Sequence, residues 1–169
     1  GFCARFDSNA LPKIIEQYVD TGKLKVIFRD FPLAMHPMAA LAASYAACAG
    51  EQGKFLEMHE ALFAEPEKLA QGDFVAISSM VSGLDSKKLS ACLQSPQYLA
   101  QRSEQGFRPS REVAGDIMEG QKLGIVSTPS FFIGASKPAG SEMQGVYMRG
   151  ALDFPAFKEV ITQVLEQKS

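Results

Sequence analysis

Cysteine is the residue type in this chain that is best suited to covalent chemistry, and it occurs as Cys3, Cys48 and Cys92. A thiolate at a helix N-terminus is stabilised by unpaired N–H groups and by the helix dipole, which lowers a cysteine pKa from roughly 8.5 to about 3.5–7.5. Such a thiolate is a good leaving group in disulfide exchange, and a second cysteine one helical turn along resolves the mixed disulfide. Cys3 precedes apolar residues at helical spacing. A lone cysteine at such a position is either a redox centre or, more commonly, a packed core residue.

The other two cysteines fall in different predicted helices of the middle of the chain. Cys48 and Cys92 form either a structural disulfide or two separate buried thiols, because cysteine is among the residue types most often buried. The odd number of cysteines favours one unpaired thiol, and a fourth cysteine would complete two pairs. Two pairs would agree with an oxidising compartment.

Metal binding and nucleic-acid binding are not indicated. His36 and His59 lie apart without recognisable ligand spacing, so we expect satisfied core or surface histidines and no metal site with Cys3. Seventeen basic and nineteen acidic side chains give a formal charge of −2, with no Lys/Arg run that would suit nucleic acid or anionic lipid. Arg29 and Asp30 either tune a site electrostatically or form a solvated strand end, and we favour the second.

The elements that must position these residues follow from hydrophobic spacing and from Gly, Pro and capping signals. A helical section, divided by short Gly and Pro segments, is predicted between one strand before it and two strands after it. The predicted elements are a helix from Cys3 to Tyr18 kinked near Pro12, a strand over Leu24–Arg29, helices over 37–52, 55–63, 73–80 and 85–93, a helical segment over 97–124 interrupted at Gly106 and Pro109, strands over 130–133 and 146–149, and a helix over 153–167.

Five stretches carry a resemblance: Gly1-Phe2-Cys3, Phe28–Leu33 with His36-Pro37, Cys48–Phe55, Gly124–Gly134, and Gly150-Ala151 with Phe154 and Phe157. Together they resemble the exported branch of the DsbA-like thiol–disulfide oxidoreductases. The resemblance spans nearly the whole chain, and the stretch around Thr128-Pro129 is its most specific part. It departs from the family at Leu56, where a Trp is usual, and around 103–113, which looks like an insertion. In this resemblance, Gly1-Phe2-Cys3 looks like the last three residues of a Cys-x-x-Cys motif, and Gly124–Gly134 looks like the cis-proline loop.

The order of the predicted elements agrees with this resemblance, which implies an α/β thioredoxin-like fold with a helical insertion domain. Residues 1–33 and 121–169 would form the thioredoxin-like domain, and 34–120 the inserted helical domain. The first strand of that fold is absent from the chain, and its place lies between the strands expected at Val26 and Phe131. An empty slot would leave two rows of unpaired backbone groups. We therefore expect residues that precede Gly1 in the parent protein, or another segment, to fill it.

The resemblance also implies roles for particular residues. Cys3 would be the resolving cysteine, its nucleophilic partner would directly precede Gly1, and Gly1-Phe2 would be the dipeptide between them. Thr128 and Pro129 would bind substrate, because a cis bond there holds the Thr128 backbone beside the disulfide, where an extended peptide can pair with it. The partners implied are protein or peptide thiols and disulfides and an unidentified redox partner, without a cofactor. A periplasmic or otherwise exported location is implied as well.

Two alternatives from other functional classes share this fold. One is a glutathione-dependent transferase or isomerase of the kappa type, which uses a serine or a lone thiol. The other is a thioredoxin-like module that has lost its redox pair and binds peptides. A cysteine, a serine or any other residue directly before Gly1 would distinguish the three. Oxidase, reductase and isomerase activities differ in reduction potential and partner surface, which no motif here encodes.

Overall fold

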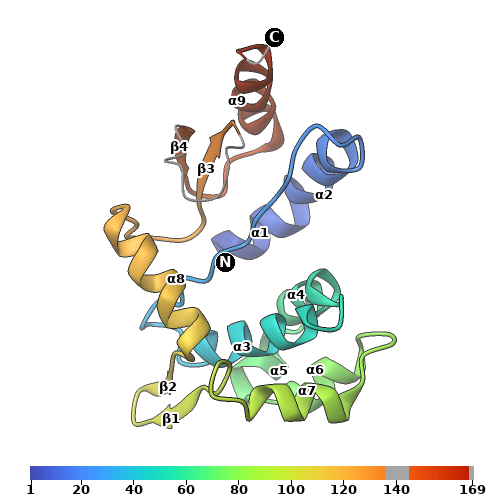
Figure 1. The fold of residues 1–169 in the computed structure, drawn as a ribbon, viewed down its shortest axis with the longest axis vertical. Helices are drawn as coiled ribbons and strands as arrows, with labels where there is room; N and C mark the ends of the chain where they lie inside the picture. Colours follow the sequence, from blue (N-terminus) through green and yellow to red (C-terminus); the bar gives the residue numbers. More distant parts are fainter. Residues whose placement is uncertain (136–144, 168–169) are drawn as a thin grey trace. The chain divides into compact units, whose positions relative to one another are not determined.

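The computed structural model describes residues 1–135 and 145–167, and the chain forms two compact units. Unit 1 consists of Gly1–Phe28 and Ile125–Ser169, and unit 2 consists of Arg29–Gly124. Figure 1 shows the helices and strands of each unit. None of the helices in the described residues is both long enough and apolar enough to cross a lipid bilayer.

Unit 1 begins with a helix that breaks where the sequence predicts a kink. Helix α1 ends at Asn9, α2 begins at Leu11 with Pro12 in its first turn, and a π-helical turn, η1, follows. Proline is tolerated in a first helical turn because the N–H it lacks has no partner there. The elements of unit 1 are α1 (Phe2–Asn9), α2 (Leu11–Ile14), η1 (Ile15–Val19), β3 (Ser130–Gly134), β4 (Gly145–Arg149) and α9 (Phe154–Glu166).

The two strands of unit 1 pair in antiparallel register, and one face of the pair lies on the core. Phe131 is opposite Met148, and Phe132 is opposite Tyr147. Because side chains alternate along a strand, Phe131 packs inward with the buried Met148, whereas Phe132 and Tyr147 lie on the outer face. Both strands agree with the prediction. The buried residues of this core are Ala10, Ile14, Tyr18, Met148, Phe157 and Ile161.

The predicted strand over Leu24–Arg29 is wrong as an assignment, because residues 24–33 have no regular secondary structure. Its alternation is nevertheless present: Leu24 and Val26 pack against the core of unit 1, whereas Lys25 between them is exposed and Ile27 after them is 68% exposed. A strand is defined by its ladder of hydrogen bonds, and no other described segment forms a ladder with this one. The side-chain pattern therefore has the period of a strand, while the pairing that would complete it is not made.

Unit 2 is a helical domain, and two of its helices, α6 (Phe74–Ser79) and α7 (Ser86–Leu93), begin at the capping residues expected from the sequence. The carboxylates of Asp73 and Asp85 accept hydrogen bonds from backbone N–H groups in the first turns of α6 and α7. Helix α5 was not predicted; Pro66 begins it, and Gly72 ends it in the left-handed conformation with φ 75°. The elements are α3 (Ala39–Gly50), α4 (Phe55–Ala64), α5 (Pro66–Gln71), α6 (Phe74–Ser79), α7 (Ser86–Leu93), β1 (Gln101–Ser103), β2 (Gly106–Arg108) and α8 (Arg111–Lys122).

The helical segment predicted over 97–124 is wrong in its first half, which forms the β1–β2 hairpin. Gly106 has φ 123°, and a Cβ atom built on it would lie 2.4 Å from the carbonyl oxygen of Pro37. Only glycine fits that conformation and that approach, so a regular helix cannot run through this position. Helix α8 begins after Pro109, and the buried Ser110 caps it by accepting a hydrogen bond from the Val113 N–H.

Candidate functional site

The thiol of Cys3 lies in the first turn of α1 and is partly buried. Helix α1 begins at Phe2, and Gly1 before it offers no side chain to cap the helix. The first N–H groups of a helix have no partner within the helix, so a sulfur in this turn lies close to hydrogen-bond donors and to the positive end of the dipole. Cys3 is not part of a disulfide. Cys3 therefore offers a free thiol at the start of a helix.

The loop around Thr128 and Pro129 is held by residues on both of its sides. The Thr128–Pro129 peptide bond is cis. The Ser130 hydroxyl donates to the carbonyl oxygen of Ser127 at 2.8 Å, and the Gly150 N–H donates to the carbonyl oxygen of Pro129 at 2.9 Å. No residue in the described part of the chain hydrogen-bonds to the backbone of Thr128. The loop is thus fixed at its ends, while the backbone groups at its centre can pair with another chain.

Aromatic packing joins the helix that carries Cys3 to the strand that follows Pro129. The ring centroids of Phe6 and Phe131 are 4.5 Å apart, and the Phe157 ring lies 5.4 Å from Phe6 and 4.8 Å from Phe131. Phe6 lies one helical turn after Cys3, and Phe131 lies two residues after Pro129. The three rings therefore hold α1 against the start of β3. A direct contact between Pro129 and Cys3 stays a prediction.

Polar contacts add to the attachment of α1. Asp153, the residue before α9, accepts hydrogen bonds from Arg5 at 3.1 Å and from Asn9 at 3.4 Å. The Lys13 ammonium lies 6.0 Å from the centre of the Phe154 ring. The side chains of Arg5 and Asp153 are more than half exposed, so this pair contributes little free energy, on the order of 1 kcal/mol or less. Its contribution is orientation: it aligns one face of α1 with the start of α9.

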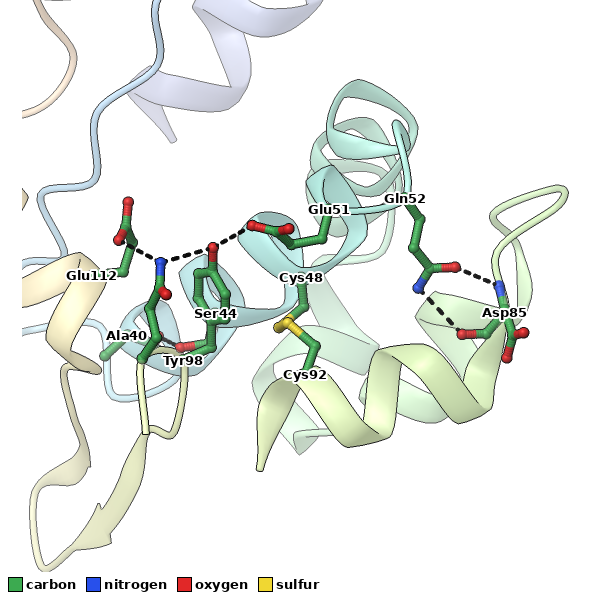
Figure 2. The surroundings of a disulfide bond; sticks show 10 residues. Ala40, Ser44, Cys48, Glu51, Gln52, Asp85, Cys92, Tyr98 and Glu112 are labelled. Atoms are coloured by element: carbon green, nitrogen blue, oxygen red, sulfur yellow. Dashed lines mark hydrogen bonds between the residues drawn. A yellow bond between two sulfur atoms is a disulfide. The ribbon is translucent and has the colours of Figure 1, made fainter. Parts of the chain in front are cut away.

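Cys48 and Cys92, whose pairing the sequence left open, form a disulfide between α3 and α7 (Figure 2). Their Cα atoms are 5.7 Å apart, within the range of about 4.4–6.8 Å that a disulfide requires. The same two elements are joined by Gln52 and Asp85: the Gln52 amide donates to the Asp85 carbonyl oxygen and accepts from the Asp85 N–H. The disulfide therefore belongs to the framework of unit 2 and leaves Cys3 as the remaining thiol.

A second polar network in Figure 2 is centred on the buried Tyr98. Its hydroxyl donates to the Glu51 carboxylate at 2.6 Å and accepts from the Gln97 amide at 3.1 Å. The Gln97 amide also donates to Glu112 on α8. The hydrogen bond to Glu51, with burial and the nearby negative charges, raises the pKa of Tyr98 to about 12. The hydroxyl therefore stays protonated and links α3 with α8.

The interpretation of Arg29 and Asp30 as a solvated strand end is wrong for Asp30, which is partly buried against α8. Its N–H donates to Asp116 at 2.8 Å, and Arg29 forms ion pairs with Asp116 at 3.1 Å and with Glu119. Burial first, and then the carboxylates of Asp116 and Glu112, together raise the pKa of the Asp30 carboxyl to about 6, although Arg29 opposes the rise.

The two histidines, His36 and His59, have different environments. His36 is exposed, and His59 lies between the rings of Phe55 and Phe63 on α4. In residues 1–135 and 145–167 no group of three or more His, Cys, Asp or Glu residues could hold a metal ion.

Sequence reasoning missed Arg149, whose Nε donates to the Ser127 hydroxyl. Strand alternation could have placed Arg149 on the outer face, but not beside Ser127.

Comparison with known proteins agrees with this geometry. A family model described as Thioredoxin matches residues 1–147. The chain is similar to the crystal structure of alpha-DsbA1 from Wolbachia pipientis, with a TM-score of 0.77, 25% sequence identity, and coverage of 98% of this chain and 80% of that chain.

Two curated relatives are similar over 78% of the chain. A putative protein-disulfide oxidoreductase of Rickettsia prowazekii is 22% identical over 135 residues, and the Na(+)/H(+) antiporter NhaA 3 of Salinispora tropica is 30% identical over 132 residues. The alignments cover 45% of the first protein and 18% of the second. The chain thus spans less than half the length of either relative.

Proposed function

This chain is a DsbA-like member of the thioredoxin family, and from this premise we propose that it acts in thiol–disulfide exchange with protein or peptide substrates. In this proposal Cys3 is the resolving cysteine of a Cys-x-x-Cys site, the nucleophilic cysteine directly precedes Gly1 in the parent protein, and Gly1-Phe2 is the dipeptide between them. The observation that carries the proposal is the free thiol of Cys3 at the start of a helix that packs, through Phe6, on the strand after the cis Thr128–Pro129 bond.

The exchange steps balance without a cofactor. In the oxidising direction a substrate thiolate attacks the disulfide between the nucleophilic cysteine and Cys3. A mixed disulfide with the nucleophilic cysteine forms, and Cys3 leaves as the thiolate. A second substrate thiolate then attacks the substrate sulfur of the mixed disulfide and releases the nucleophilic cysteine, so two electrons pass from substrate to enzyme. In the reducing direction the Cys3 thiolate attacks the mixed disulfide and releases the substrate thiolate. The helix N-terminus stabilises the negative charge in either direction.

Substrate binding in this proposal uses the backbone of Thr128. An extended peptide can add to exposed backbone N–H and C=O groups as a further strand, and this pairing does not depend on the peptide sequence. The lack of hydrogen bonds from described residues to the Thr128 backbone supports this role. The fixed ends of the loop support it too, because a pre-organised loop loses less entropy when a peptide binds.

The domain organisation and location belong to the same proposal. We assign residues 1–33 and 121–169 to the thioredoxin-like domain and 34–120 to the helical insertion. The division of the chain at Phe28/Arg29 and at Gly124/Ile125 supports this assignment within a few residues. The Cys48–Cys92 disulfide supports a periplasmic or otherwise exported location, because disulfides persist in oxidising compartments.

The test compares insulin reduction, or peptide oxidation, by the chain Gly1–Ser169 and by a parent form in which a cysteine precedes Gly1. Only the parent form should cycle, because Cys3 alone has no partner thiol. In the parent form, Cys3→Ala should stop turnover and accumulate a mixed disulfide with substrate. The control Ser8→Ala on the exposed side of α1 should be fully active. Equal activity of the two forms would contradict the role given to Cys3.

A further inference from the structure

We infer that Arg149, assisted by Tyr147, is a positioning residue that latches the Thr128–Pro129 loop for peptide substrates. The inference rests on the proposed function, because it concerns the loop to which the substrate backbone would bind. It adds two side chains from a different strand to that site. It also predicts which substrates depend on them: peptides, and not small disulfides without a peptide backbone.

We use latch for two hydrogen bonds from residues of β4, one from Arg149 to Ser127 and one between Tyr147 and Ser130. Arg149 is opposite Ser130 in the antiparallel register, and its Nε donates to the hydroxyl of Ser127 at 2.8 Å. Ser127 directly precedes Thr128, so this hydrogen bond fixes the residue from which the substrate-binding backbone begins. It joins residues that are 22 positions apart in the sequence. A bond from a guanidinium is charge-assisted, and its planar donors restrict the direction of the acceptor.

Tyr147 holds the other end of the same turn. Its hydroxyl and the hydroxyl of Ser130 share a hydrogen bond at 3.1 Å, and Ser130 also donates to the Ser127 carbonyl oxygen. Tyr147 and Arg149 are two residues apart on β4, so they lie on the same face of the β3–β4 pair shown in Figure 1. Ser127 and Ser130, which bracket the Thr128–Pro129 bond, are thus both bound from the outer face.

The latch leaves the functional part of the loop accessible. Its contacts go to Ser127 and Ser130, and the Gly150 N–H binds the Pro129 carbonyl oxygen. The Thr128 backbone receives no hydrogen bond from the described residues. Because the flanks are fixed before a peptide arrives, less ordering entropy is lost on binding. Loss of the latch should therefore weaken peptide binding and leave the reactivity of the Cys3 thiol unchanged.

The experiment uses the chain Gly1–Ser169, in which Cys3 is the thiol outside the disulfide. Two probes are compared: 5,5′-dithiobis(2-nitrobenzoate), and an extended eight-residue peptide whose central cysteine carries thionitrobenzoate in a mixed disulfide. In both reactions the Cys3 thiolate attacks a sulfur of the probe, a new disulfide with Cys3 forms, and thionitrobenzoate leaves with the electron pair of the broken bond. Its release is followed by absorbance as a function of probe concentration.

The variants isolate the Arg149–Ser127 bond. Arg149→Met and Ser127→Ala should each raise the half-saturating peptide concentration about fivefold, as expected for one such hydrogen bond. The double variant should add little to either single change, because both remove the same contact. Ser127→Thr, which keeps the hydroxyl, should bind the peptide as tightly as wild type does. Arg108→Met, at an exposed arginine of β2, is the matched control and should behave as wild type.

The outcomes separate this inference from the proposed function. If the wild-type reaction with the peptide does not saturate, the loop does not dock peptides, and both the proposed function and the inference are overturned. If it saturates and Arg149→Met and Ser127→Ala match wild type, only the inference is overturned. Equal slowing with both probes would also overturn it, because the variants would then have disturbed Cys3 itself. The inference is supported if Arg149→Met and Ser127→Ala weaken the reaction with the peptide alone and Ser127→Thr reacts like wild type.

Discussion

Replacing Asp30 by Asn should stabilise the protein at neutral and alkaline pH and have almost no effect at pH 4. The pKa of Asp30 is raised from its usual 3.8 to about 6 by burial first and then by the carboxylates of Asp116 and Glu112. Arg29 lowers it only in part, because its guanidinium also pairs with Asp116 and Glu119. The folded protein therefore binds the Asp30 proton more tightly than the unfolded chain does.

The sign and the size of the effect follow from linkage. The protonated carboxyl contributes stability below pH 3.8, and this contribution is lost as the pH rises through about 6. The difference between the two pKa values corresponds to about 3 kcal/mol as an upper value, and the remaining solvent contact of Asp30 reduces it to about 2 kcal/mol. Asn has nearly the same shape and cannot ionise. Asp30→Asn should thus raise the free energy of unfolding by about 2 kcal/mol at pH 8.

Urea unfolding of wild type and Asp30→Asn at pH 4, 5, 6, 7 and 8 measures this difference. Most other titrating groups are common to the two proteins and cancel. Glu104→Gln is the control, since Glu104 is an exposed carboxylate in the β1–β2 turn of the same unit, and its difference from wild type should be nearly constant with pH. An Asp30→Asn variant that is less stable than wild type at pH 8, or whose difference does not change between pH 4 and pH 8, would refute the reasoning.

Three further changes test the packing of the two units by urea unfolding. Cys92→Ala should lower the free energy of unfolding by about 4 kcal/mol, because the disulfide to Cys48 joins residues 44 positions apart; reduction of wild type should have the same effect. Asp85→Ala should cost about 1 kcal/mol, because the first turn of α7 loses its cap, whereas Asp85→Asn should keep most of it. Phe157→Ala should cost about 3–5 kcal/mol, because a ring that is 1% exposed leaves a cavity, and a loss below about 1 kcal/mol would contradict its place in the core.

Local chemistry explains which elements could be predicted from the sequence. Asp73 and Asp85 mark helix starts because a carboxylate accepts the N–H bonds of the first turn, and the structure has both caps. The runs over 130–133 and 146–149 alternate and carry β-branched or aromatic residues, and both are strands. These signals lie within a few residues of the feature that they specify, so they can be recognised without knowledge of the rest of the fold.

Two of the three elements that were mispredicted or missed depend on distant residues, and the third is too short. The run Leu24–Arg29 has the alternation of a strand, but its pairing with another segment is not encoded in its own residues. The β1–β2 hairpin requires Gly106 to approach the backbone of Pro37, 69 positions earlier. The residues around Gly106 carry no sequence signal of that contact. Helix α5 has its boundary signals in Pro66 and Gly72, but its six residues are too few for helical periodicity to be recognised.

The candidate site divides in the same way. Cys3, Thr128 and Pro129 could be named from residue types and from a family resemblance, because reactive sulfur and X-Pro motifs are visible in the letters. The contacts that orient these residues could not be predicted from the sequence. Ser127 lies outside the strand that Arg149 ends, so only the folded turn brings its hydroxyl to the guanidinium.

The apolar core of unit 1 carries part of the functional geometry. Phe6 follows Cys3 by one turn, and Phe131 follows Pro129 by two residues, so their contact at 4.5 Å ties the position of the sulfur to that of the loop. Phe157 touches both rings and therefore limits how far α1 can shift along β3. Close-packed side chains resist such shifts, because any gap loses contacts that water does not replace. Residues that a sequence pattern assigns only to the core thus set the spacing between the Cys3 thiol and the Thr128 backbone that we propose binds the substrate.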